Sequence, residues 1–180
     1  MIAEIDGALL VDKPKGLTSH DVVALVRRRA GLQRVGHTGT LDPVAQGLLV
    51  LLLGRATKHQ QALQAHEKLY EATIALGAKT DTGDTEGRFI AQAPVQALDR
   101  DRLTQVLTSF VGPLLQTPPA YSAVKVHGRP AYWWARRRCP VVLQPRTVHI
   151  FELTLLGVIP TAIHPHTNFP LAAGSAPPTV

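Results

Sequence analysis

The chain has 180 residues, and its 19 lysines and arginines against 13 aspartates and glutamates give a formal net charge of +6. Apolar residues make up 45% of it. This lets a domain of about 150 residues bury roughly two-thirds of its unfolded surface, which excludes a disordered protein. Cys139 is the only cysteine, which excludes an intrachain disulfide framework and a cysteine-ligated zinc site and favours a reducing, cytoplasmic location. No run approaches about 18 uncharged apolar residues, so we expect neither export nor membrane insertion.

The positive charge is concentrated in two segments. Between Val22 and His66 the only carboxylate is that of Asp42, and between Arg102 and Phe151 there are seven cations and no acid. This distribution favours a polyanionic partner such as a nucleic acid, although a solvated basic surface explains it equally well. Aromatic side chains among the cations of the second segment favour RNA, because they can stack on unpaired bases, although large aromatics are often part of the core. They are Tyr121, Tyr132, Trp133 and Trp134.

The first predicted elements are a strand and a helix. The apolar run 8–11 predicts the strand, and a turn follows it. The helix begins after Thr18 or Ser19 as its N-cap and ends at Gly31. Arginines 27–29 fall in its last turn, where the helix dipole favours cations, so helix capping explains them better than RNA binding.

The remaining elements follow the loop of residues 36–43. The continuous apolar run 48–53 predicts a buried, central strand. The others are strands over 70–76, 121–126 and 148–155, turn residues over 80–87, a helix capped by Asp99 and stopped at Gly112-Pro113, and a short helix beginning at Pro130. Strands and helices mix without strict alternation. This predicts an α+β fold with a mixed or antiparallel sheet and flanking helices.

The C-terminal segment differs in composition from the rest. After Glu152 no Asp, Glu, Lys or Arg occurs, and five prolines interrupt every candidate element. We therefore expect residues 158–180 to form a disordered tail and residues 1–157 to hold the folded domain.

The loop Gly36-His37-Thr38-Gly39-Thr40-Leu41-Asp42-Pro43 is the candidate for chemistry. Gly36 and Gly39 permit backbone angles closed to other residues, and Pro43 keeps Asp42 out of helical dihedrals. The loop holds one carboxylate in a basic stretch, where cations favour its ionised form as nucleophile or base. The alternative is an Asp-Pro turn in which Asp42 bonds its own backbone, and the residues alone leave both open.

Four segments together resemble the TruB family of tRNA pseudouridine-55 synthases over about residues 8–155. They are DKPKGLTSHDVV (12–23), RVGHTGTLDPVAQGLLVLLLGRATK (34–58), KLYEATIALGAKTDTGDTEG (68–87) and TPPAYSAVKVHGRPAYWWAR (117–136). The resemblance implies the pseudouridine synthase fold and isomerisation of uridine 55 in the T loop of tRNA. It implies no metal and no organic cofactor. The target base must leave its stack to be reached.

The resemblance also implies roles for single residues. Asp42 matches the catalytic aspartate, and whether it attacks C1′, adds at C6 or removes a sugar proton stays open. Tyr70 matches the tyrosine that stacks on the flipped base, the alternative being a core aromatic. His37 matches the histidine that contacts the flipped-out RNA, the alternative being a bond within its own loop.

Other matching residues lie around these. Lys13 and Pro14 match an early motif that supports the site structurally, a role that we also expect for Gly36 and Gly39. Tyr121 and Lys125 match a segment near the bound RNA, where a base stack and a phosphate contact are the natural roles.

The resemblance ends before the expected tail. The family continues with a segment of the type CSKGTYIR, whose arginine pairs with the catalytic aspartate, and nothing in residues 156–180 matches it. The usual C-terminal PUA domain has no counterpart either, so we expect a C-terminally truncated or frame-altered catalytic domain with an incomplete fold. The first hypothesis is a monomeric cytoplasmic tRNA pseudouridine synthase. The alternatives are a weak or inactive RNA-binding fragment of that family and a basic structural domain whose RNA affinity does not depend on salt.

Overall fold

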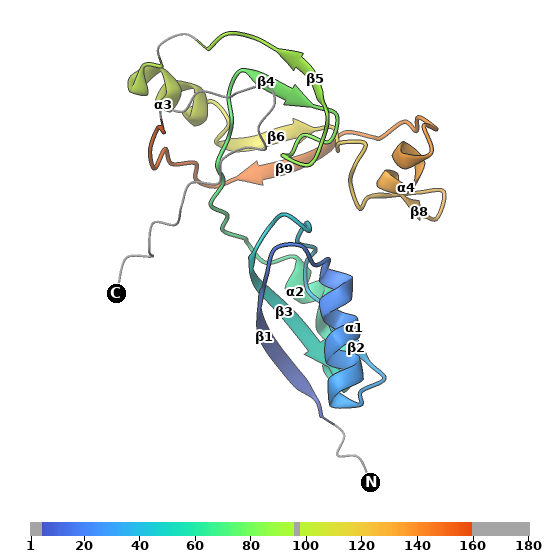
Figure 1. Ribbon diagram of the computed structural model, residues 1–180. Helices are drawn as coiled ribbons and strands as arrows, with labels where there is room; N and C mark the ends of the chain where they lie inside the picture. The colour runs from blue at the N-terminus through green and yellow to red at the C-terminus, as the bar shows by residue number, and fades with distance from the viewer. Residues whose placement is uncertain (1–4, 96–97, 160–180) are drawn as a thin grey trace. The chain divides into compact units, whose positions relative to one another are not determined.

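The structure is a computed structural model that describes residues 5–95 and 98–159 (Figure 1). Contacts within the chain divide it into two compact units, residues 1–73 and residues 74–180. The expected disordered tail lies outside the described residues except for positions 158 and 159. The boundary at residue 157 therefore stays a prediction.

The first unit is built on a three-stranded antiparallel sheet in the order β1-β3-β2. Its strands are β1 (Gly7–Lys13), β2 (Val35–His37) and β3 (Gly47–Leu53). Gly7 pairs with Leu53 and Lys13 with Gly47, so β1 and β3 are matched along their full length. The predicted buried central strand is confirmed as β3.

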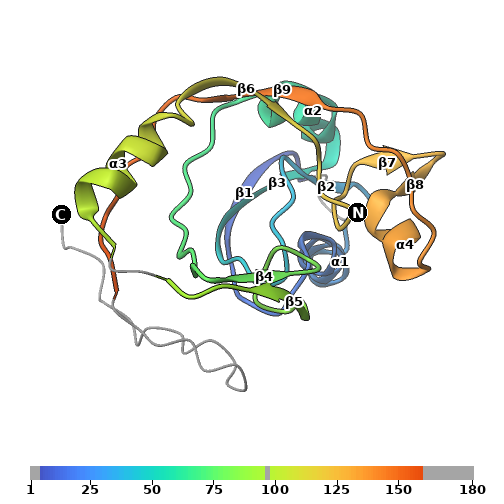
Figure 2. The ribbon, with the colours of Figure 1, turned by 90° about the horizontal axis from the view of Figure 1, so that it is seen from above.

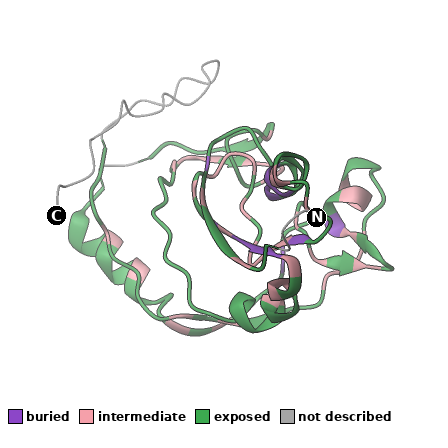
Figure 3. Cartoon of the chain, turned by 90° about the horizontal axis from the view of Figure 1, so that it is seen from below, coloured by how far each residue is buried: buried purple, intermediate pink, exposed green. Residues whose placement is uncertain are grey.

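Helix α1 (Ser19–Ala30) supplies the other half of the core of this unit. One cluster joins its buried valines to the buried residues of β2 and β3: Val22, Val23, Val35, Leu49, Leu51 and Leu53. Figure 3 colours the buried positions purple. Fully burying one such side chain contributes about 1.5–3 kcal/mol, so this cluster is the main source of stability in the unit.

The ends of α1 follow the signals in its sequence. Thr18 is the N-cap, and it forms a capping box with Asp21: the hydroxyl of Thr18 accepts from the Asp21 N–H, and the Asp21 carboxylate accepts from the Thr18 N–H. Gly31 closes the helix in the left-handed conformation, with φ of 65°. Arg27 donates from Nη2 to the Val35 carbonyl at 3.2 Å, so its charge ties α1 to β2.

Two short helices follow β3, namely the 3-10 helix η1 (Gly54–His59) and α2 (Gln60–Gln64). The Asp6 carboxylate joins the start of β1 to η1, because it accepts from the Arg55 backbone N–H at 2.6 Å and from Arg55 Nε at 2.5 Å. Gly54 has φ of 57°, and a Cβ there would collide with Asp6. Only glycine therefore fits this junction without strain.

The predicted strand over 70–76 is wrong. Residues 67–76 are assigned to no strand, and the side chains of Leu69 and Tyr70 are 99% and 66% exposed. Alternation of apolar and polar residues gives a segment one apolar and one polar face, as in a half-buried strand. A strand also needs a neighbouring strand to bond its backbone N–H and C=O groups. The described residues supply none to this segment.

The described part of the second unit contains three two-stranded antiparallel sheets and two helices (Figure 2). The sheets are β4 (Ala78–Thr80) with β5 (Phe89–Gln92), β6 (Gly112–Gln116) with β9 (Arg146–Ile150), and β7 (Lys125–Val126) with β8 (Arg129–Pro130), and the helices are α3 (Arg100–Thr108) and α4 (Ala131–Arg136). As predicted, Asp99 caps α3 and the turn over 80–87 joins β4 to β5. The short helix predicted to begin at Pro130 begins one residue later, with Pro130 as its N-cap.

Two other predictions in this unit need correction. The strand predicted over 121–126 is reduced to β7, and the one over 148–155 is β9, which begins and ends earlier. Both observed strands differ in length from the predicted ones, because a strand ends where its hydrogen bonds to the partner strand end and not where the apolar run ends. Gly112 and Pro113 were predicted to stop α3, but the helix ends at Thr108, and these two residues instead begin β6.

Together the units confirm an α+β fold with antiparallel sheets and flanking helices. No helix in the part of the chain that the structure describes is long and apolar enough to cross a membrane.

Candidate active site

The loop between β2 and β3 is fixed on both sides of Asp42. On one side, Leu41 donates its N–H to Ser19 Oγ at 2.8 Å, and the Ser19 hydroxyl donates to the Leu41 carbonyl at 3.2 Å. On the other side, the Pro43 carbonyl accepts from the Gly16 N–H at 2.8 Å. Asp42 is therefore held between the start of α1 and the turn that precedes it.

The side chain of Asp42 is exposed, and its carboxylate forms no hydrogen bond or ion pair with the described residues. Only its backbone carbonyl is bonded locally, accepting from the Ala45 N–H at 3.0 Å. The turn is therefore made by the backbone, and the carboxylate is not used to stabilise it. This leaves an anionic group presented on a fixed loop.

Lys13 supports the neighbouring turn. Its side chain is fully buried, and Nζ donates to the carbonyls of Pro14 at 3.0 Å and Leu17 at 2.8 Å. These bonds fix the turn that carries Gly16, which in turn holds Pro43. A buried ammonium group costs free energy unless its donors are satisfied, and here two carbonyls satisfy it.

The two glycines of the loop do not have the predicted backbone. Neither Gly36 nor Gly39 is among the glycines with positive φ, so the expectation of angles closed to other residues is wrong. Gly36 lies in the extended strand β2, where a Cβ would come within 2.9 Å of Gln60 Oε1. Its small size therefore leaves room for the side chain of Gln60, at the start of α2. A Cβ on Gly39 would meet only Lys68 Cε, at 3.7 Å.

His37 ends β2, where it pairs with Leu51 of β3. Its Nδ1 is buried, and no group in the described part of the chain bonds it. Strand β1 ends at Lys13, which pairs with Gly47 at the start of β3, whereas β2 ends at His37, which pairs with Leu51, four positions further along β3. The loop that carries Asp42 joins β2 to β3, and the hydrogen bond between Gly16 and Pro43 ties it to the turn that Lys13 supports. The structure therefore places Lys13 and Asp42 beside the same turn, and His37 lies further along the sheet.

The other predicted residues lie on other segments of the chain. Tyr70 lies in the unpaired segment and is exposed, which contradicts the alternative that it packs in a core. Tyr121 and Lys125, in the second unit, are also exposed, just before and within β7.

Sequence reasoning missed Ser19 as part of the site. It was expected only as an alternative N-cap, and the structure shows it 2% exposed and bonded to a residue far along the chain. No local signal identifies such a bond, since Ser19 also fits the start of any helix.

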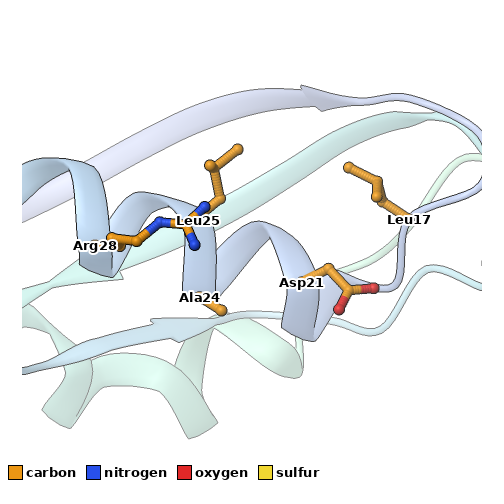
Figure 4. A pocket seen from close by; sticks show the side chains of 5 residues that line it. All are labelled: Leu17, Asp21, Ala24, Leu25 and Arg28. Atoms are coloured by element: carbon orange, nitrogen blue, oxygen red, sulfur yellow. The ribbon is translucent and has the colours of Figure 1, made fainter.

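A shallow depression on the outer side of α1 is separate from these residues (Figure 4). Leu17, Asp21, Ala24, Leu25 and Arg28 line it. None of them is a predicted site residue, and we assign it no role. Among residues 5–95 and 98–159, no three His, Cys, Asp or Glu side chains gather as a metal-binding group.

An α+β unit that holds an exposed carboxylate on a fixed loop can use that carboxylate as a nucleophile or a base, as enzymes with one catalytic aspartate do. The family model described as "TruB family pseudouridylate synthase (N terminal domain)" matches residues 27–170. The chain therefore belongs to the TruB family of pseudouridylate synthases, which confirms the resemblance seen in its motifs.

Individual proteins agree with this assignment. The chain is 51% identical to the tRNA pseudouridine synthase B of Aromatoleum aromaticum over 154 residues, which cover 86% of this chain and 50% of that protein. The enzyme of the same name from Opitutus terrae is 47% identical over 84% of this chain and 64% of its own length. The chain thus spans about half to two-thirds of these curated relatives.

A solved structure shows the same fold. It is one chain of a crystal structure of a Cbf5–Nop10–Gar1 complex. The match covers 87% of this chain and 36% of the Cbf5-complex chain, with a TM-score of 0.54 and 25% sequence identity. This supports the pseudouridine synthase fold expected from the sequence.

Proposed function

We propose that this protein isomerises uridine 55 in the T loop of tRNA to pseudouridine, with Asp42 as the catalytic carboxylate. The observation that carries the proposal is the exposed, unbonded carboxylate of Asp42 on a loop fixed at Leu41 and Pro43. Family membership and relatives named tRNA pseudouridine synthase B support the reaction and the substrate.

The reaction is an isomerisation, so it needs no oxidant and no second substrate. The bond between C1′ and N1 of the uridine breaks, the uracil turns, and C1′ bonds to C5. The proton on C5 is lost, and N1 gains one. Asp42 serves either by attacking C1′, by adding to C6 or by removing a proton from the sugar.

A fixed loop favours each of these routes, because a positioned reacting group lowers the entropic part of the barrier. The base must first be extruded from the RNA, at a cost of a few kcal/mol that is smallest in a partly unstacked loop. We assign His37 and Tyr70 to this step. The match of His37 to the family histidine supports a contact with the flipped-out RNA, and the exposed ring of Tyr70 is free to stack on a base.

The remaining predicted residues have supporting roles in this proposal. Lys13 and Pro14 hold the turn beside Asp42, and Gly36 and Gly39 belong to its loop. Tyr121 and Lys125, both exposed, would contact the RNA outside the loop by a stack and a phosphate bond. The proposal includes action in the cytoplasm as a monomer without a cofactor, and the single exposed cysteine, Cys139, fits a reducing compartment.

The test is pseudouridine formation on a T-loop RNA hairpin by the 180-residue chain and its Asp42→Asn variant. We expect the wild-type chain to form pseudouridine and the variant to form none while binding the hairpin with about the same affinity, because the substitution removes the carboxylate without adding bulk. Asp101→Asn, an exposed change in α3, is the matched control and should retain turnover.

Each other result rejects part of the proposal. Turnover by Asp42→Asn shows that Asp42 is not the catalytic group. Binding without turnover by the wild-type chain makes it an RNA-binding member of the family. Binding that is absent or insensitive to salt leaves a structural or protein-binding role.

A further inference from the structure

In the second unit, two arginine side chains lie against the ring of Trp133. The guanidinium carbon of Arg137 lies 3.7 Å from the centroid of the Trp133 ring, and that of Arg129 lies 5.4 Å from it. The three residues are spaced four apart, from the β7/β8 hairpin through α4 (Figure 2). Both distances are within the range of a cation–π interaction.

The tryptophan is itself anchored to the hairpin. Trp133 meets Trp134 edge to face, with ring centroids 4.7 Å apart, and Trp134 Nε1 donates to the Val126 carbonyl at 3.1 Å. Arg137 is fixed a second time, because its Nη1 donates to the Trp133 carbonyl at 3.3 Å. The guanidinium of Arg137 is therefore held by two contacts before any ligand binds, and that of Arg129 by its contact with the ring.

The chain does not neutralise these cations. Arg129 and Arg137 are exposed, and neither forms an ion pair within the described residues. The surrounding segment, from Arg102 to Phe151, contains no Asp or Glu. A guanidinium stacked on a ring keeps N–H donors at its edge. Arg137 uses Nη1 for the Trp133 carbonyl, which leaves Nε and Nη2 to match two oxygens of a phosphate.

We propose that Trp133 positions Arg129 and Arg137 as a binding site for the phosphodiester backbone of RNA. The proposal rests on RNA as the partner named under the proposed function, and it does not depend on turnover. Trp133 was predicted to stack on a base or to be part of a core, and Arg137 covers one face of its ring at 3.7 Å. A base could stack on that face only by displacing Arg137. The structure therefore favours contact with phosphate over contact with bases.

The experiment measures the affinity of the full chain for two probes as a function of salt. One probe is a single-stranded RNA, and the other is an abasic sugar-phosphate oligomer of the same length and charge. The variants are Trp133→Leu, the double variant Arg129→Gln with Arg137→Gln, and the combination of all three. Arg138→Gln is the matched control, because it removes a neighbouring exposed charge, while the ring contacts of Trp133 are with Arg129 and Arg137.

We expect the slope of log affinity against log salt to fall by about 1.4 in the double arginine variant, since each phosphate contact on a single strand contributes about 0.7. Trp133→Leu removes no charge, yet it should lower the slope by about 0.7 or more on both probes. Adding it to the double arginine variant should change nothing further. Trp133→Tyr, which retains a ring, should keep most of the slope, and Arg138→Gln should leave it nearly unchanged.

Three results overturn the proposal. An unchanged slope in Trp133→Leu shows that the ring does not position the arginines. A loss confined to the RNA that carries bases makes Trp133 a base-stacking residue. Competition by an acidic peptide as strong as that by the abasic oligomer assigns the site to a protein partner. A chain that shows the expected slopes but forms no pseudouridine contradicts only the proposed function.

Discussion

The position of Asp42 depends on a serine that takes no part in the chemistry. Ser19 exchanges two hydrogen bonds with the backbone of Leu41, the residue before Asp42, and it is 2% exposed. Without the hydroxyl, the N–H and carbonyl of Leu41 lose their partner, and leaving a buried backbone group unbonded costs about 1–3 kcal/mol. Ser19 is therefore a positioning residue.

We predict that Ser19→Ala lowers the free energy of unfolding by about 1–3 kcal/mol. It should also lower the rate of pseudouridine formation more than the affinity for RNA, because a misplacement near 1 Å can cost about a hundredfold in rate. Urea denaturation and single-turnover kinetics measure the two effects. Ser109→Ala, an exposed change at the end of α3, is the control. A destabilised Ser19→Ala protein with a normal rate would show that Asp42 is held by other contacts.

At the scale of elements, one ion pair joins the start of β1 to η1. Hydrogen bonds from the Arg55 backbone N–H and side chain lower the pKa of Asp6 below its ordinary value of 3.8. A carboxyl group whose pKa is lower in the folded chain stabilises the fold above the unfolded pKa. That contribution is lost as the pH falls through the lowered, folded value.

We therefore predict that Asp6→Asn destabilises the protein at neutral pH and that the difference from wild type shrinks as the pH falls below about 3.8. Thermal melts across pH 2 to 7 measure it. Asp12→Asn, which removes an exposed carboxylate from the same strand, is the control. A constant gap between Asp6→Asn and wild type down to the lowest pH would show that the carboxyl has no altered titration.

Elements with local signals could be predicted from the sequence, and those that depend on distant partners could not. Thr18 and Gly31 mark the ends of α1, and both act as expected. The segment 70–76 has the pattern of a strand, yet the described residues leave it unpaired. The site shows the same division. The loop around Asp42 could be identified from its motif, whereas the bond from Ser19 to Leu41 spans 22 positions and has no local signature.

At the scale of the whole molecule, burial is unequal between the two units. Seven apolar residues are buried in the described part of the first unit: Val22, Val23, Val35, Leu49, Leu51, Leu52 and Leu53. In the described part of the second unit, only Pro118 and Ala131 are buried, and Val106 of α3 and Phe110 just after it are 50% and 47% exposed. Since burial of apolar surface is the main source of stability, the first unit should be the more stable.

We predict that amide hydrogen exchange is slowest in β1, β3 and α1 and clearly faster in β6, β9 and α3, because local opening is easier where few apolar contacts must be broken. Mass spectrometry of the intact chain, with intrinsic rates subtracted, measures it. Leu51→Ala, which cuts a side chain with no exposed surface, should cost about 2–5 kcal/mol and speed exchange in β1, β3 and α1. Equal protection of residues 112–116 and 7–13 in the wild-type chain would mean that β6 and β9 are stabilised by more than their described contacts, and the unequal stability inferred from burial would be wrong.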